Sequence, residues 1–187
     1  MLMSEKVNKL LVLDLDETLI HATKTKLDNL LVDFTFDEYY IYKRPHLEHF
    51  LIQAAKYFKL AIWSSAGDIY VNEIVAAIKP AAIAFEVVWA RAKCSMKRDR
   101  IFDSYYFEKR LDKFKKRGFL LEQILIVDDT AEKATCNYGN AIYSKEYKGN
   151  ADDKELLRLL EYLLTLKDVE NVRTIEKRYW RTIQSGT

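Results

Sequence analysis

The chain contains three short runs of apolar residues, each of which ends at polar side chains. The runs are Leu10–Leu13, Leu60–Trp63 and Ile124–Val127, and each is four residues long. Apolar runs of this length are too short for helices and are typical of strands that are buried on both faces of a sheet. The sequence therefore predicts a central sheet that contains these three strands.

Most of the remaining chain has the spacing of amphipathic helices. We expect helices over residues 45–58, 70–78, 107–116 and 156–164, and a last short strand at 141–143. Strands that alternate with helices form parallel sheets with right-handed crossovers. We therefore expect one α/β domain over residues 1–187, built on a doubly wound parallel sheet.

Two segments depart from this alternation. Residues 31–36 alternate between apolar and polar, Asp37-Glu38 can form a turn, and residues 39–42 can return as a second strand. This pattern predicts a β-hairpin flap after the first strand. Residues 83–106 are the least regular part of the chain, with a possible strand over 84–92. We therefore expect a small insertion at about 81–106, after the second of the three strands, that acts as a partial cap.

Composition adds a few limits. The chain has 187 residues, of which 49% are hydrophobic, which is ample for a packed core. It lacks an apolar stretch of transmembrane length and a signal-peptide pattern, so we expect a cytoplasmic protein, or a nuclear one in a eukaryote, without a membrane partner. The spacing of Cys94 and Cys136 fits neither a zinc site nor a disulfide framework.

Charge is unevenly distributed along the chain. The net charge is only +2, yet residues 86–118 carry eleven basic and five acidic side chains. A segment of this kind suits a phosphorylated or otherwise anionic partner, although a charge run is usually no more than a solvated basic face.

The first apolar run ends in Asp14-Leu15-Asp16, the most informative motif of the chain. Side chains two residues apart on an extended chain point the same way, about 6.6 Å apart. At the carboxyl end of a central strand, where α/β sheets bind ligands, one carboxylate could attack a substrate while the other transfers a proton. A calcium loop is excluded, because Thr18 and Leu19 stand where it needs a third ligand and a glycine. Capping of a following helix is the simpler alternative.

The other two runs also end in candidate chemistry. Ser64 and Ser65 follow the second run, Asp128 and Asp129 follow the third, and Lys109 precedes the third. The stretches that matter for comparison are Leu13-Asp14-Leu15-Asp16-Glu17-Thr18-Leu19-Ile20-His21, Lys43-Arg44-Pro45, Ile62-Trp63-Ser64-Ser65-Ala66 and Ile126-Val127-Asp128-Asp129. In order and context they resemble the haloacid-dehalogenase superfamily of phosphatases. Within it, the chain resembles the RNA polymerase II C-terminal-domain phosphatases, also called NLI-interacting-factor-like, over about residues 9–165.

This resemblance implies a Rossmann-like fold and a phosphatase that depends on Mg²⁺ and forms an aspartyl-phosphate. Asp14 would be the nucleophile, and Asp16 would protonate the leaving oxygen and then activate water. Asp14, Asp128 and the backbone carbonyl of Asp16 would bind Mg²⁺, with Asp129 bound directly or through a metal water. A carboxylate can attack a phosphate anion only when such a cation offsets their repulsion.

The resemblance also implies residues that hold the phosphoryl oxygens. These are Lys109 and either Ser64 or Ser65, because adjacent serines leave the register open by one. Arg110 and Lys113 are alternatives to Lys109, since both are basic neighbours in the sequence.

Two further residues have weaker assignments. Thr18 would brace the catalytic loop, and Arg91 lies where the small phosphatases place an arginine that faces the substrate. We expect a phosphopeptide or phosphoprotein substrate rather than a nucleic-acid partner. A small metabolite or a polynucleotide end phosphate is the alternative substrate, and a phosphatase-like binding module without activity is the alternative function. The sequence defines no oligomeric state.

Overall fold

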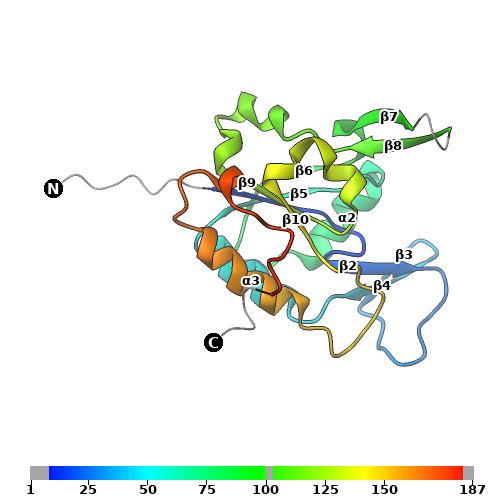
Figure 1. Ribbon diagram of the computed structural model, residues 1–187. Helices are drawn as coiled ribbons and strands as arrows, with labels where there is room; N and C mark the ends of the chain where they lie inside the picture. Colours follow the sequence, from blue (N-terminus) through cyan, green and yellow to red (C-terminus); the bar gives the residue numbers. More distant parts are fainter. Residues whose placement is uncertain (1–8, 100–102, 183–187) are drawn as a thin grey trace.

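The fold is built on a five-stranded sheet whose paired strands all run parallel. The computed structural model describes residues 9–99 and 103–182. The strand order is β10-β9-β1-β5-β6 (Figure 1). The strands are β1 (Leu10–Leu13), β5 (Lys59–Trp63), β6 (Phe85–Trp89), β9 (Ile124–Asp128) and β10 (Ala141–Tyr143). The three predicted apolar strands thus occupy the middle of the sheet, and the α/β prediction is confirmed.

The two faces of the sheet bury alternate side chains of each central strand. Leu11 and Leu13 of β1 pack with the three α-helices, whereas Leu10 and Val12 pack on the opposite face. The helices are α1 (Leu47–Ala55), α2 (Asp68–Ile78) and α3 (Glu155–Leu166). The opposite face is covered by 3₁₀ segments, chiefly η2 (Leu111–Arg117) and η4 (Ala131–Asn140). Alternation of this kind follows from the two-residue period of a strand that is buried on both faces.

The flap after β1 has one more strand than the sequence predicts. It consists of β2 (Ile20–Thr23), β3 (Phe34–Phe36) and β4 (Tyr39–Lys43), in the order β2-β4-β3. The predicted hairpin corresponds to β3 and β4. Strand β2 is not predicted, because its alternation covers only four residues and directly follows the acidic motif.

A second hairpin lies at the same end of the sheet as the flap. It is formed by β7 (Ser95–Asp99) and β8 (Ser104–Glu108), and Figure 1 shows it and the flap extending beyond the carboxyl end of β1. The expected insertion at about 81–106 is divided in the structure. Its first part is β6, the edge strand of the central sheet, and only the hairpin departs from the sheet.

The predicted helix over residues 107–116 is wrong. Phe107 belongs to β8, and a 3₁₀ segment begins only at Leu111. Residues up to Glu108 pair with β7 instead, and the three-residue spacing of the buried Leu111 and Phe114 fits one face of a 3₁₀ helix as well as of an α-helix. Short 3₁₀ segments also occur at η1 (Arg91–Lys93), η3 (Leu121–Gln123) and η5 (Val172–Thr174).

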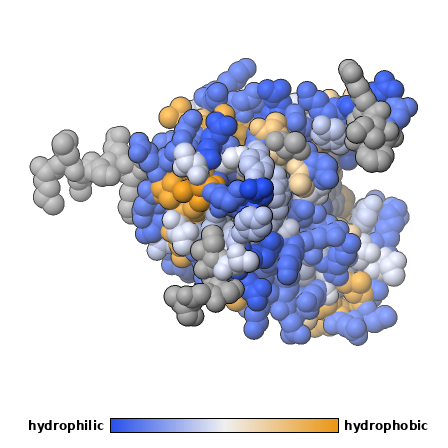
Figure 2. Space-filling view, viewed as in Figure 1, coloured by the Kyte–Doolittle hydropathy of each residue, from blue (hydrophilic) through white to orange (hydrophobic). Residues whose placement is uncertain are grey.

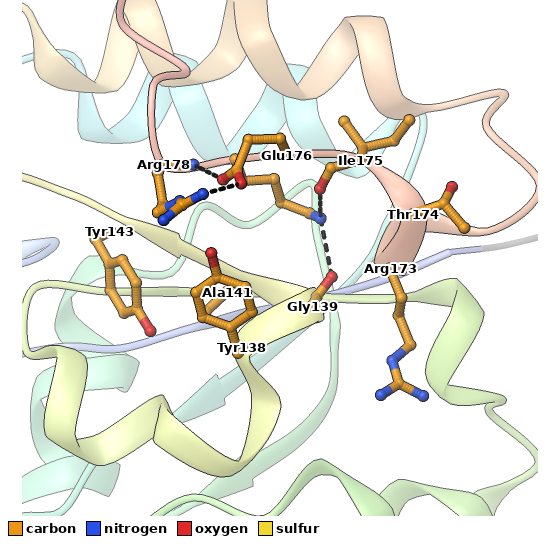
Figure 3. Close-up of a pocket in the computed structure, with 10 residues that line it drawn as sticks. Tyr138, Gly139, Ala141, Tyr143, Arg173, Thr174, Ile175, Glu176 and Arg178 are labelled. Atoms are coloured by element: carbon orange, nitrogen blue, oxygen red, sulfur yellow. Dashed lines mark hydrogen bonds and ion pairs between the residues drawn. The ribbon is translucent and has the colours of Figure 1, made fainter.

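The chain after α3 returns across the sheet edge and closes against β10. Trp180 is buried and its Nε1 donates to the Tyr143 carbonyl at 3.0 Å. Figure 3 shows the pocket that this segment lines, and the carbonyls of Gly139 and Ile175 accept there from the Lys177 ammonium at 2.8 and 2.7 Å. Among the described residues, no helix is long and apolar enough to cross a membrane.

Candidate active site

A buried ion cluster lies where β1 and β9 end. Asp14, Lys109 and Asp128 are each at most 1% exposed. The Lys109 ammonium donates to Asp128 Oδ2 at 2.6 Å and also to Asp14 Oδ1. Thr18, the residue expected to brace the loop, donates its hydroxyl to Asp14 Oδ2 at 3.3 Å. Parallel pairing of β1 with β9 brings these residues together, because adjacent strands present their carboxyl ends at one edge.

Three carboxylates converge at this position. One oxygen each of Asp14, Asp128 and Asp129 lies within 4.8 Å of the other two. Lys133 is 4.0 Å from Asp129, at the edge of ion-pair distance. Carboxylate oxygens are the hard ligands that Mg²⁺ prefers, so this donor set fits the metal that the family resemblance implies.

The electrostatics of the cluster also favour a bound cation. Burial, together with the charge of Asp14, raises the pKa of Asp128 to about 7, although Lys109 opposes this shift. Burial alone would lower the pKa of Lys109, but the charges of Asp128 and Asp14 raise it above its ordinary value. The lysine is therefore cationic, and one ammonium leaves the three carboxylates with excess negative charge. A divalent cation would neutralise that excess.

Asp16 is held separately from the other carboxylates. Its Oδ1 accepts a hydrogen bond from the Tyr70 hydroxyl at 2.5 Å, and its Oδ2 accepts one from the Ser64 hydroxyl at 3.2 Å. Burial and the charge of Asp14 raise the pKa of Asp16, while the hydrogen bonds from Tyr70 and Ser64 limit the rise. A carboxyl whose pKa is raised holds its proton more readily, which suits Asp16 to the role of a general acid.

The structure distinguishes the two adjacent serines. Ser64 is buried at the end of β5, and its hydroxyl also accepts from the Ala66 amide at 3.0 Å. Ser65 is half-buried, and its carbonyl accepts from Arg91 Nε at 2.8 Å. The Ser64 hydroxyl therefore faces the Asp16 side of the site. Arg91 is exposed and lies with its guanidinium 5.3 Å from the centre of the Phe107 ring.

Lys109 reaches the cluster from an extended link between β8 and η2. Its amide donates to the Lys133 carbonyl at 2.9 Å, and its own carbonyl accepts from the Asn137 side chain. Asn137 Oδ1 also accepts from the Leu111 amide at 3.2 Å. These contacts with η4 hold the backbone of Lys109 on both sides, so the orientation of its side chain is fixed.

The two alternatives to Lys109 point elsewhere. Arg110 pairs with Asp112 at 3.0 Å, and Lys113 donates to the Lys93 carbonyl at 2.5 Å. Within residues 9–99 and 103–182, neither forms an ion pair with the carboxylate cluster.

Sequence reasoning missed Tyr70 and Asn137. Tyr70 fits the helical pattern of α2 as a member of its apolar face, and Asn137 lies in a stretch without a period. The sequence feature that could have indicated these two residues is a polar side chain within a segment that packs against the sheet. A polar side chain that must be buried needs a partner there.

A hollow of about 360 Å³ opens beside Asp16. It is lined by Asp16, Glu17, Ala22, Phe36, Tyr39, Ala66 and Tyr70. Phe36 and Tyr39 come from the flap and meet the Tyr70 ring edge-on, with ring centres 5.4 and 6.5 Å away. The flap therefore forms one wall of the entrance, and its aromatic rings contact a residue that binds Asp16.

Comparison with known proteins agrees with this geometry. The family model of NLI interacting factor-like phosphatases matches residues 9–173. The chain is 30% identical over 169 residues to "CTD small phosphatase-like protein 2" of Dictyostelium discoideum, covering 87% of this chain and 28% of that protein. It is 28% identical to "Nuclear envelope morphology protein 1" of Schizosaccharomyces pombe, covering 94% of this chain and 37% of that protein. The chain thus spans well under two thirds of the length of either relative.

Solved structures show the same fold. The structure of Fcp1, described as an essential RNA polymerase II CTD phosphatase, matches with a TM-score of 0.58 at 19% identity and covers 88% of this chain and 52% of that chain. A haloacid dehalogenase-like hydrolase from Xanthomonas campestris matches with a TM-score of 0.55 at 8% identity and covers 86% of this chain and 96% of that chain. The match of the family model to residues 9–173 shows that the chain belongs to the NLI interacting factor-like phosphatases.

Proposed function

We propose that this chain hydrolyses phosphomonoesters through an aspartyl-phosphate on Asp14. The observation that carries the proposal is the Asp14 side chain itself, buried at the end of β1 and fixed between Thr18 and Lys109. A nucleophile that is held in one orientation loses little freedom when it reacts.

In the first step, an Asp14 oxygen attacks phosphorus and the bond to the leaving oxygen breaks. Asp16 in its acid form gives its proton to that oxygen. In the second step, Asp16 as carboxylate takes a proton from water, and the resulting hydroxide attacks phosphorus. The bond to Asp14 then breaks and inorganic phosphate leaves. The raised pKa of Asp16 suits both roles, because the same group must hold a proton and then accept one.

Asp14, Asp128 and Asp129 would hold Mg²⁺, together with the backbone carbonyl of Asp16. The ion supplies positive charge that offsets the repulsion between the phosphate and the carboxylates. Lys109 would hold a phosphoryl oxygen as well as the carboxylates, and the Ser64 hydroxyl would bind a second oxygen. Both are preorganised donors, and such donors stabilise the charge of the transition state.

The substrate we propose is a serine or threonine phosphate in a protein. The hollow beside Asp16 has aromatic walls, which suits a residue next to the phosphorylated one. Arg91 would contact the substrate from the other side of Ser64, where its Nε already binds Ser65. A relative that is named as a CTD phosphatase supports a phosphoprotein substrate. Another relative is named for the nuclear envelope, and we propose that this chain acts in the cytoplasm or in the nucleus.

The test is a phosphatase assay with p-nitrophenyl phosphate and a panel of phosphoserine and phosphothreonine peptides, with and without Mg²⁺. We expect Mg²⁺-dependent release of phosphate from both kinds of substrate and a higher kcat/KM for peptides. Release from p-nitrophenyl phosphate and metabolites alone would reject the protein substrate. No release from any substrate, in a chain that folds, would reject the enzymatic function.

A further inference from the structure

A cationic surface adjoins the candidate active site and has no role in the chemistry proposed above. Residues 110–117 contain five basic side chains and one acidic one, Asp112, which pairs with Arg110. Within the part of the chain that the structure describes, neither Lys113 nor Lys116 forms an ion pair with a carboxylate. The exposed and half-buried side chains of η2 are all charged.

The 3₁₀ geometry of η2 arranges these cations in a row. Side chains three residues apart are eclipsed in a 3₁₀ helix, and the rise of about 2.0 Å per residue separates them by about 6 Å. Leu111 and Phe114 form the buried row against the sheet. Lys113 and Lys116 therefore share another row, and Lys93 adjoins it because its carbonyl accepts from Lys113 Nζ at 2.5 Å. We call Lys93, Lys113 and Lys116 the basic strip.

The basic strip begins directly beside the catalytic turn. Lys93 belongs to η1, and the first residue of η1, Arg91, donates its amide to the Ala66 carbonyl at 2.9 Å. The Ala66 amide in turn donates to the Ser64 hydroxyl. A peptide bound with its phosphate at Ser64 and Lys109 could therefore continue over η1 onto η2.

We propose that the basic strip binds an acidic peptide segment that flanks the phosphorylated residue of the substrate. The proposal rests on the proposed function and specifies its substrate class. Side chains on one side of an extended peptide recur every two residues, at about 6.6 Å, which matches the spacing of the lysine row. The exposed side chains of η2 include no aromatic ring on which a nucleic-acid base could stack, which favours a peptide over a nucleic acid. Figure 2 shows mainly hydrophilic side chains, with scattered hydrophobic patches, on the face of the molecule that it presents.

The experiment compares two variants of the full chain. Lys113→Gln/Lys116→Gln removes two charges of the strip, and Lys56→Gln/Lys154→Gln removes two exposed charges beside α1 and α3 as a matched control. Both are assayed with p-nitrophenyl phosphate and with two phosphopeptides that differ only in a flank of glutamates or glutamines. Binding of the glutamate peptide is also measured by fluorescence anisotropy in an Asp14→Asn background, which needs no turnover.

We expect the strip variant to lose about 2- to 30-fold in kcat/KM for the glutamate peptide, as for two exposed ion pairs. The loss should shrink as salt is raised from about 50 to about 300 mM. The other substrates and the control variant should be unaffected. The proposal would be overturned if the strip variant and the control variant had equal kcat/KM for the glutamate peptide. It would also be overturned if an oligonucleotide of equal charge bound the strip more tightly than the peptide does. If the strip substitutions weaken binding of the glutamate peptide in the anisotropy assay but the chain with Asp14 turns over no substrate, the proposed function is rejected. The proposal that the basic strip binds an acidic peptide would then still stand.

Discussion

The direction of the Asp16 side chain decides how roles are divided among the acidic residues. The other three carboxylates share the cluster around Lys109, whereas Asp16 binds Tyr70 and Ser64. The Asp16 side chain is thus available for proton transfer, because it lies outside the group of carboxylates that would bind the metal. Two aspartates two positions apart are enough to predict a shared site, but not which atoms each one faces, because that depends on residues far along the chain.

The first prediction separates the two aspartates. Asp14→Asn should abolish turnover while the fold remains, because an amide of the same shape cannot attack phosphorus. Asp16→Asn should lower kcat by about 10²- to 10⁴-fold, the usual effect of losing an acid and base. Release of phosphate and the circular-dichroism melting curve check both variants. Turnover of Asp14→Asn near that of the wild type would contradict the covalent mechanism.

The second prediction concerns Tyr70. Its hydroxyl stabilises the charged form of Asp16, so Tyr70→Phe should raise the pKa of that carboxyl. Asp16 must carry its proton in the first step, so the basic limb of the pH profile of kcat/KM should then move to higher pH, by an amount that corresponds to one hydrogen bond of about 0.5–1.5 kcal/mol. Tyr39→Phe is the matched control, because Tyr39 lines the same hollow and, among the described residues, its hydroxyl forms no hydrogen bond to Asp16. An unshifted limb in Tyr70→Phe would remove Tyr70 from the mechanism.

At the scale of elements, the site depends on segments that are not regular helices. Lys109 lies on an extended link, held by Lys133 and Asn137 of η4. The apolar strands could be predicted because a run of four apolar residues is long enough for a buried strand and too short for a helix. The link could not, since the spacing of Leu111 and Phe114 suits both an α-helix and a 3₁₀ helix, and the choice is made by tertiary contacts. The same holds for β2, which is paired with β4 rather than defined by its own pattern.

The third prediction tests how η4 positions Lys109. Asn137→Ala removes the contacts to the Lys109 carbonyl and the Leu111 amide, so kcat should fall about 10-fold or more because the ammonium is displaced. Asn140→Ala is the control, since Asn140 belongs to the same segment but bonds to the carbonyls of Leu121 and Ile124. Both variants should lose about 1–3 kcal/mol of unfolding free energy in urea. A similar loss of kcat in both would mean that Asn137 acts only through stability.

Across the whole molecule, one buried arginine connects the flap, the catalytic loop and α3. Arg44 follows β4, donates to the Thr18 carbonyl at 3.0 Å and binds both oxygens of Asp153 at 2.9 Å. Burial alone would raise the pKa of Asp153, but hydrogen bonds from Arg44 and the Glu155 amide bring it below its usual value. Sequence analysis could not pair residues so far apart.

The fourth prediction is a dependence of stability on acid. Because the pKa of Asp153 is lowered in the fold, its contribution is present above about pH 4, the unfolded value, and is lost as the pH falls through the folded pKa. Asp153→Asn should therefore be about 2 kcal/mol less stable at pH 7, since Arg44 loses a charged partner. The difference should shrink as the pH falls below about 4, as measured by urea unfolding. A constant difference over this range would exclude the carboxylate as its cause.

The last prediction uses the fact that the carboxylate cluster exists only in the folded chain. Asp14 and Asp128 are brought together by the pairing of β1 with β9, and the unfolded chain has no such site. Mg²⁺ should therefore stabilise the fold by mass action, by about 2.7 kcal/mol at a hundredfold excess over Kd, or roughly 5–10 °C in Tm.

Chelator should reverse this shift and stop phosphate release, and Ca²⁺, with its larger and looser shell, should restore little activity. Asp128→Asn should abolish the shift in Tm, because it removes a ligand that Asp129 cannot replace. A shift of equal size in that variant, or full activity in excess chelator, would exclude a magnesium site at Asp14 and Asp128.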